Sequence, residues 1–253
     1  MKFISIYVFI AFALLQPLQA QAPKGKKPSP WSAGLFLMSD SQPYVGAGRS
    51  IRIYPSVSYE GEKLKWRGPL LQYKLIEKEK WNLSAHALVQ FAPYEEDDAP
   101  ILEGMGDRSD TLLAGLDWVY RPTPSLLVLA SFDADVLGAY DGMQATFGFQ
   151  QMLGKPWETL SGSLGAGLLL QDQAWTQYFV GVPESKATPE RPAHTPGESF
   201  HPYLSAQLLV RISKKWSWFT LSRIEFLDET WRDSPLIADD YRLVTFTALN
   251  YSF

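Results

Sequence analysis

The sequence ends with Tyr-Arg-Leu-Val-Thr-Phe-Thr-Ala-Leu-Asn-Tyr-Ser-Phe, residues 241–253, and this stretch decides the fold. Every second residue belongs to one row, which is Tyr241, Leu243, Thr245, Thr247, Leu249, Tyr251 and Phe253. The residues between them, such as Arg242, Asn250 and Ser252, are smaller, polar or mixed. This alternation predicts a β-strand whose two faces meet different surroundings. A tilted strand needs about 9 to 11 residues to cross a bilayer, so this one is long enough.

The same stretch resembles the closing strand of a bacterial outer-membrane barrel. In such barrels an aromatic last residue, preceded by aromatic or apolar residues at alternate positions, is the signal read by the insertion machinery. Leu249, Tyr251 and Phe253 are the residues expected to carry this assembly signal. The alternative for the stretch taken alone is a terminal edge strand of a soluble β-sandwich.

The composition agrees with two-faced strands and restricts the function. Hydrophobic residues make up 46% of the 253 residues and aromatic residues 14%, yet the mean hydropathy is only -0.13. A net charge of -4 gives no basic face for nucleic acid. The sequence contains no cysteine, which excludes disulfides, thiolate catalysis, zinc–thiolate sites and a lipid-modified cysteine.

The first residues predict export. Lys2 is followed by the apolar run Phe3 to Leu15 and by Ala20-Gln21-Ala22, as in a secretory signal peptide cleaved after Ala22 or after Ala20. We therefore predict a signal peptide over 1–22, a flexible mature N-terminus over 23–30 and one barrel domain over 31–253. No other segment approaches 18 consecutive apolar residues, so a membrane would be crossed by strands.

The remaining chain alternates in the same way between turn signals. In Trp81 to Phe91, aromatic residues stand at both ends of an apolar row, while Asn82, Ser84, His86 and Gln90 form the other row. The predicted strands are Trp31–Met38, Ile51–Tyr59, Lys63–Glu77 with a bulge at Gly68-Pro69, Trp81–Phe91, Leu112–Tyr120, Leu126–Ala134, Tyr140–Met152, Trp157–Gln171, Ala174–Val182, Phe200–Arg211, Trp216–Leu227 and Tyr241–Phe253.

These twelve strands predict an all-β, antiparallel transmembrane β-barrel of the outer-membrane type. Short turns alternate with long loops at 92–109, 183–199 and 228–240, and an even strand number returns both ends to the periplasm. A ten-strand barrel, without Trp31–Met38 and Ala174–Val182, keeps that parity and stays open as an alternative. No segment shows a convincing helical period.

Charged residues on the polar rows predict a wet lumen. Asp117, Asp133 and Asp135 would be costly in a dry core. By parity, six basic residues point inward with them, namely Arg52, Lys65, Arg67, Arg211, Arg223 and Arg242.

Several short motifs together resemble the MipA/OmpV family of outer-membrane proteins over nearly all of the mature chain. They are Pro43-Tyr44-Val45-Gly46, Pro55 with Tyr59-Glu60-Gly61, Leu102-Glu103-Gly104-Met105, Tyr178 before Gly181-Val182, Asp233-Ser234-Pro235 and the final Tyr251-Ser252-Phe253. Tyr178-Phe179-Val180-Gly181-Val182 has one residue more than the family's usual Tyr-Tyr-Gly-Val. We expect structural roles, mainly in loop geometry, for Pro43, Tyr44, Gly46, Gly104, Met105, Asp233, Ser234 and Pro235.

The resemblance implies a non-enzymatic scaffold in the cell outer membrane. Its partners would be membrane lipid, the barrel insertion machinery, a periplasmic lytic transglycosylase and a murein synthase. The alternatives are a narrow solute channel and a surface receptor or adhesin. We expect no cofactor, and the acidic run Glu95 to Asp98 lacks the spacing of a calcium loop.

A barrel lipid hydrolase is the remote alternative. Ser84 lies two residues from His86, and His201 shares a predicted strand face with Ser205, so a nucleophile and a base could meet. Parity directs both pairs into the lumen, whereas barrel lipid hydrolases present theirs to lipid. We therefore predict no catalytic residues.

Overall fold

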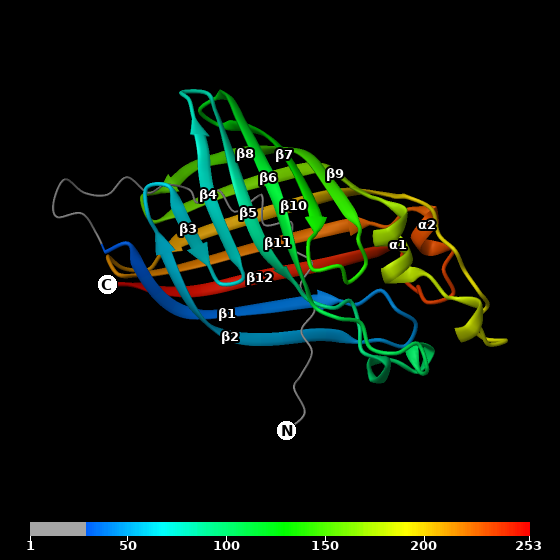
Figure 1. Cartoon of the computed structure of the whole chain (residues 1–253). Coiled ribbons are helices and arrows are strands. Elements are labelled where there is room, and N and C mark those ends of the chain that lie inside the picture. Colours follow the sequence, from blue (N-terminus) through cyan, green and yellow to red (C-terminus); the bar gives the residue numbers. More distant parts are fainter. Residues whose placement is uncertain (1–28) are drawn as a thin grey trace.

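A computed structural model describes residues 29–253, which form a closed barrel of twelve antiparallel strands (Figure 1). The predicted signal peptide and almost all of the predicted flexible N-terminus lie outside the described residues. The strands are β1 (Trp31–Ser41), β2 (Arg49–Glu60), β3 (Leu64–Arg67), β4 (Leu70–Glu77), β5 (Trp81–Gln90), β6 (Thr111–Thr123), β7 (Leu126–Asp135), β8 (Met143–Trp157), β9 (Leu160–Gln171), β10 (Ser199–Arg211), β11 (Trp216–Phe226) and β12 (Tyr241–Ser252). The helices are α1 (Gln173–Val180) and α2 (Glu229–Arg232).

The C-terminal strand closes the barrel, as the sequence predicts. β12 pairs with β1 on one side, with Leu35 opposite Leu249 and Met38 opposite Phe246, and with β11 on the other. Both of its edges are therefore hydrogen-bonded, which satisfies the backbone polar groups that lipid cannot satisfy. A sandwich edge strand is excluded for this stretch.

The two ends of the barrel differ. β1 begins and β12 ends at the end where short turns join the strands, while α1, α2 and the long connections lie at the other end (Figure 1). Outer-membrane barrels carry short turns on the periplasmic side and long loops outside. We therefore call the two ends periplasmic and extracellular.

One predicted strand is wrong. Residues 174–182 do not enter the wall, because Gln173–Val180 form the helix α1. The carboxylate of Asp172 caps the helix by accepting the amide proton of Trp175 at 2.8 Å. Trp175 and Phe179, one helical turn apart, stack with ring centroids 5.7 Å apart. Over only eight residues, the same sequence is compatible with the alternation of a strand and with one apolar face of a helix. Contacts with other loops favour the helix.

A second predicted strand is divided. Lys63–Glu77 was predicted as one strand with a bulge, but Gly68 adopts φ +55° and the chain reverses there, giving β3 and β4. The total remains twelve, so the ten-strand alternative is wrong. β3 is short: it pairs with three residues of β2, Ser58, Tyr59 and Glu60, and on its other side with β4. Some strand ends also differ from the prediction. β8 extends through the expected turn near Gly154, and the chain turns at Glu158 and Thr159.

The strands have an apolar outer row and a buried inner row. On β5 the buried residues are Asn82, Ser84, His86, Leu88 and Gln90. Large apolar side chains remain exposed on the outer rows of other strands, including Ile51, Ile53, Leu116, Phe132, Phe149 and Leu204. A lipid-facing wall has this distribution. Within residues 29–253, no helix is both long and apolar enough to cross a membrane.

Candidate functional site: a capped barrel with a polar lumen

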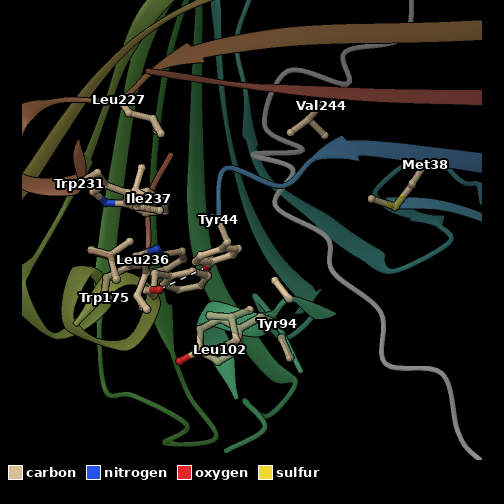
Figure 2. Packing of buried hydrophobic residues seen from close by; sticks show 14 of the residues in the cluster. Met38, Tyr44, Tyr94, Leu102, Trp175, Leu227, Trp231, Leu236, Ile237 and Val244 are labelled. Atoms are coloured by element: carbon tan, nitrogen blue, oxygen red, sulfur yellow. Dashed lines mark hydrogen bonds between the residues drawn. The ribbon is translucent and has the colours of Figure 1, made fainter. Parts of the chain in front are cut away.

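The extracellular connections pack together into a cap. Figure 2 shows Tyr44, Tyr94, Leu102, Trp175 and Leu236, which come from four different connections, in one cluster. Tyr94, Leu102, Trp175 and Leu236 have an exposed fraction of 0%. These segments therefore bury an apolar core at the end of the barrel, and this core continues onto inward-facing strand residues such as Met38 and Leu88.

Most of the predicted family-motif residues meet in this cap, although they come from separate loops. The Tyr44 hydroxyl donates to the backbone oxygen of Phe179 at 3.3 Å, and Tyr44 forms an isolated β-bridge with Ile237. The Ser234 hydroxyl donates to the backbone oxygen of Val180 at 2.6 Å. Pro43, Gly46, Gly104, Met105, Asp233 and Pro235 belong to the same connections, and Gly46 and Gly104 both have φ +78°. Their structural role remains a prediction, but their place is the cap.

The β5–β6 connection is fastened to α1 and to the β9–β10 connection. The Tyr178 hydroxyl accepts from the Ser109 amide at 2.6 Å and donates to the Ser109 carbonyl at 3.1 Å. The Arg108 guanidinium lies over the rings of Tyr94 and Tyr178, 5.1 and 4.9 Å from their centroids. We call Arg108, Ser109 and Tyr178 the latch.

Arg191 makes a further anchor that the sequence does not indicate. Its Nη1 donates to the backbone oxygens of Ile101 at 2.5 Å and Glu103 at 2.9 Å, and its Nη2 donates to that of Lys186 at 2.7 Å. The local sequence of this Pro-rich loop carries no pattern that would single out Arg191, because two of its three partners are backbone atoms of the distant β5–β6 connection.

The cap holds its tyrosines in the neutral form. Burial raises the pKa of Tyr44, Tyr94, Tyr140 and Tyr178 above the usual value of 10.0. Arg108 opposes this effect at Tyr94, because a nearby positive charge favours the phenolate.

His86 occupies the lumen between two carboxylates. Its Nδ1 lies 3.0 Å from Asp117 Oδ2 and its Nε2 lies 2.5 Å from Asp133 Oδ1. Each of the two hydrogen bonds needs one proton. With two protons, the imidazole and the two carboxylates together have one negative charge, whichever atoms carry the protons. Gln72 donates to Asp117 at 2.9 Å and Gln144 to Asp133 at 3.2 Å. We call these five residues the histidine cluster.

The nucleophile–base pair that the lipid-hydrolase alternative requires at Ser84 and His86 does not form in this arrangement. Both ring nitrogens of His86 face carboxylates and neither is directed to Ser84, which lies on the same buried row. His201 is also buried, and its Nδ1 accepts from the Asp228 amide at 3.3 Å. A Cβ added at Gly115 would lie 2.6 Å from two atoms of the His86 ring, so a small residue there makes room for the imidazole.

The other side of the lumen carries a second set of charges. Arg242 forms a two-pronged pair with Asp40, with Nε 2.9 Å from Oδ1, and lies 3.9 Å from Glu225. Arg223 pairs with Glu225 at 3.1 Å and lies 3.9 Å above the ring of Tyr203. The charges of these two arginines and two carboxylates cancel. Parity correctly placed Arg223 and Arg242 inside.

Among residues 29–253, some polar atoms of the lumen have no hydrogen-bond partner. Asp117 Oδ1, Ser131 Oγ and Thr146 Oγ1 are buried without one, and their residues lie side by side on β6, β7 and β8. Such atoms need water or a polar solute. Within residues 29–253, no group of three or more His, Asp or Glu side chains is arranged to hold a metal ion.

Comparison with known proteins places the chain in a family. Residues 33–253 match the family model described as MltA-interacting protein MipA. The chain belongs to the MipA family. A curated relative named outer membrane protein YiaT occurs in Escherichia coli O157:H7 and in Escherichia coli strain K12. In both cases it is 26% identical over 228 residues, which cover 88% of this chain and 90% of the relative. This MipA-family chain is an outer-membrane protein.

Solved barrels of low identity resemble it in fold. An outer membrane channel from Pseudomonas putida F1 is 12% identical with a TM-score of 0.49, over 94% of this chain and 100% of that one. The CymD monoaromatic hydrocarbon channel is 10% identical with a TM-score of 0.46, over 98% and 94% of the two chains. Both TM-scores are below 0.5, so neither likeness carries a conclusion about this chain.

Proposed function

We propose that this MipA-family barrel works by binding, as a scaffold that holds murein-remodelling enzymes at the periplasmic face of the outer membrane. The observation that supports this best is the cap. Four extracellular connections bury Tyr94, Leu102, Trp175 and Leu236 completely, and the latch and Arg191 tie these connections together. A barrel closed in this way is suited to an anchoring role rather than to open diffusion.

The description of the family supports the choice of partner. It names an interaction with MltA. We propose a lytic transglycosylase as the partner of this chain because the chain belongs to that family. The periplasmic turns, such as Lys78–Lys80 and Ile212–Lys215, are the parts of the barrel that such an enzyme can reach. The barrel itself would contribute no catalytic group.

The test is co-purification from the host envelope. Tagged protein, extracted in mild detergent, should recover a lytic transglycosylase or a murein synthase, identified by mass spectrometry and by murein-cleaving activity. A variant with Glu190→Gln and Asp239→Asn, both exposed in the extracellular connections, is the control and should recover the same enzymes. Repeated purification without either enzyme would remove this proposal.

A narrow channel is the second candidate, favoured by the unpartnered oxygens of Asp117, Ser131 and Thr146 in the lumen. Polar atoms along a wall can exchange hydrogen bonds with a passing solute. Refolded protein in a planar bilayer tests the idea, with the latch variant Tyr178→Phe as the comparison. Steady single-channel steps from the parent protein would favour the channel over a purely scaffolding role.

A further inference from the structure

Folding separates the charges of this chain between the two ends of the barrel. The whole sequence has a net charge of only -4. The five extracellular connections, residues 42–48, 91–110, 136–142, 172–198 and 227–240, hold seventeen acidic and four basic residues, a net charge of -13. Sequence order hides this separation, because acidic and basic segments alternate along the chain.

The periplasmic end has the opposite sign. Its five turns hold five lysines and three glutamates. Strand residues near these turns add Lys65, Arg67, Lys74, Arg121 and Arg211 against Glu60 and Glu77, so this end has a net charge of +5. We call it the basic rim.

Several lysines of the basic rim are available to a partner. Lys63, Lys78, Lys80 and Lys214 are exposed, and among residues 29–253 none of the four forms an ion pair. Arg67 and Lys74, which point inward, are paired with Glu60 and Glu77. The exposed lysines extend past the wall on long side chains, where they can reach a flat or extended partner.

We infer that the basic rim binds murein directly. Murein lies next to the periplasmic face of the outer membrane, and the free carboxylates of its peptide stems make it a polyanion. A rim of +5 attracts such a polymer, while the -13 of the other end is separated from it by the membrane, which is several Debye lengths thick. This contact goes beyond the proposed enzyme scaffold and does not require it.

Binding to purified sacculi tests the inference without any partner enzyme. Purified protein in neutral detergent is mixed with sacculi freed of bound proteins and then sedimented. We expect the bound fraction to fall at least roughly threefold between ~0.05 M and ~0.5 M salt, because the Debye length shortens over this range. Sedimentation that does not depend on salt would contradict the inference for the unmodified protein.

A matched pair of variants distinguishes an effect of the basic rim on binding from an effect of the net charge of the protein. Lys63→Gln, Lys78→Gln, Lys80→Gln and Lys214→Gln together remove four positive charges from the rim, and the bound fraction should fall severalfold. Asp97→Asn, Glu184→Gln, Glu190→Gln and Asp239→Asn change the same number of exposed charges at the other end. Binding of this control should stay at the parent level. A control that changes binding as strongly as the rim variant would overturn the inference.

Vesicles containing phosphatidylglycerol supply the other anionic surface of the periplasm. If the rim variant loses binding to these vesicles but still sediments with sacculi, the rim contacts lipid and the murein assignment is wrong. Failure with sacculi leaves enzyme recovery unaffected, because co-purification of a transglycosylase is measured separately.

Discussion

At the scale of single residues, His86 shows how the lumen accommodates charge. Two carboxylates from neighbouring strands hold one imidazole. Gln144 donates to the second oxygen of Asp133, and Gln72 donates to the Asp117 oxygen that also faces His86. The glycine at 115 leaves space for the ring. The side chains of His86, Asp117 and Asp133 are only 3–4% exposed, so each depends on the others.

Removing the imidazole should therefore destabilise the barrel. His86→Ala leaves Asp117 and Asp133 facing each other without the shared protons, and breaking such a buried charged group costs about 3 kcal/mol of unfolding free energy. Ser84→Ala, two positions away on the same buried row, is the matched control and should cost less than about 1 kcal/mol. Urea unfolding in lipid vesicles measures both. Equal effects of the two substitutions would contradict the role given to His86.

The same two variants examine the remote alternative of a lipid hydrolase. Because His86 is held by carboxylates and not by Ser84, neither substitution should alter the lipid composition of the host membrane. Thin-layer analysis of extracted lipids measures this. A lipid species that disappears in both variants would show that Ser84 and His86 act together.

At the scale of elements, the latch couples the β5–β6 connection to α1. Tyr178→Phe removes both hydrogen bonds to Ser109 and keeps the ring, so the loop should open more often. Limited proteolysis within 91–110 should become severalfold faster, while the barrel strands stay protected. Tyr241→Phe, at an exposed position on β12, is the control and should leave the cleavage rate unchanged.

The cap should also loosen at alkaline pH. Below about pH 10 its phenols are neutral whether the cap is closed or open, so pH has no effect through them. Above that pH the exposed phenols of an open cap lose protons, whereas burial keeps the pKa of Tyr44, Tyr94, Tyr140 and Tyr178 high in the closed cap. Closed-cap stability therefore falls as pH rises beyond 10.

Tyrosinate absorbance and loop proteolysis, followed together against pH, measure this loosening. The expected result is a late group of titrating tyrosines whose ionisation coincides with cleavage within 91–110. If all tyrosines of the mature protein titrate together near pH 10 while the loop stays protected, the cap does not bury these phenols in solution.

At the scale of the whole molecule, we predict that the terminal strand carries the signal for assembly. Phe253 is 62% exposed and its ring lies 5.5 Å from that of Tyr251, so deleting it removes little buried area. If the insertion machinery reads this terminus, deletion should nevertheless lower the outer-membrane level of the protein severalfold. Quantitative blotting of membrane fractions measures it, with Phe253→Tyr as the control that keeps an aromatic end. Normal levels of the truncated protein would contradict the assembly signal.

Most strands of the barrel wall can be predicted from the sequence alone, but not all of them. Strands such as β5 and β12 are predictable because alternation over ten or more residues has no helical equivalent. Residues 174–182 are too few for that distinction, and Gly68-Pro69 is compatible with a bulge and with a reversal of the chain. The predicted total of twelve was right although one member was wrong and another was two strands.

What the sequence determined by itself is the two-faced strand pattern, the closing role of Tyr241–Phe253 and the charged lumen, because a period of two is a local property of the chain. Tertiary structure decided the cap, the histidine cluster and the separation of charge. The residues that make them, such as Tyr44 and Phe179 or His86 and Asp133, are far apart in sequence. Only strand register and loop packing bring them within hydrogen-bonding distance, and neither can be read from a local pattern.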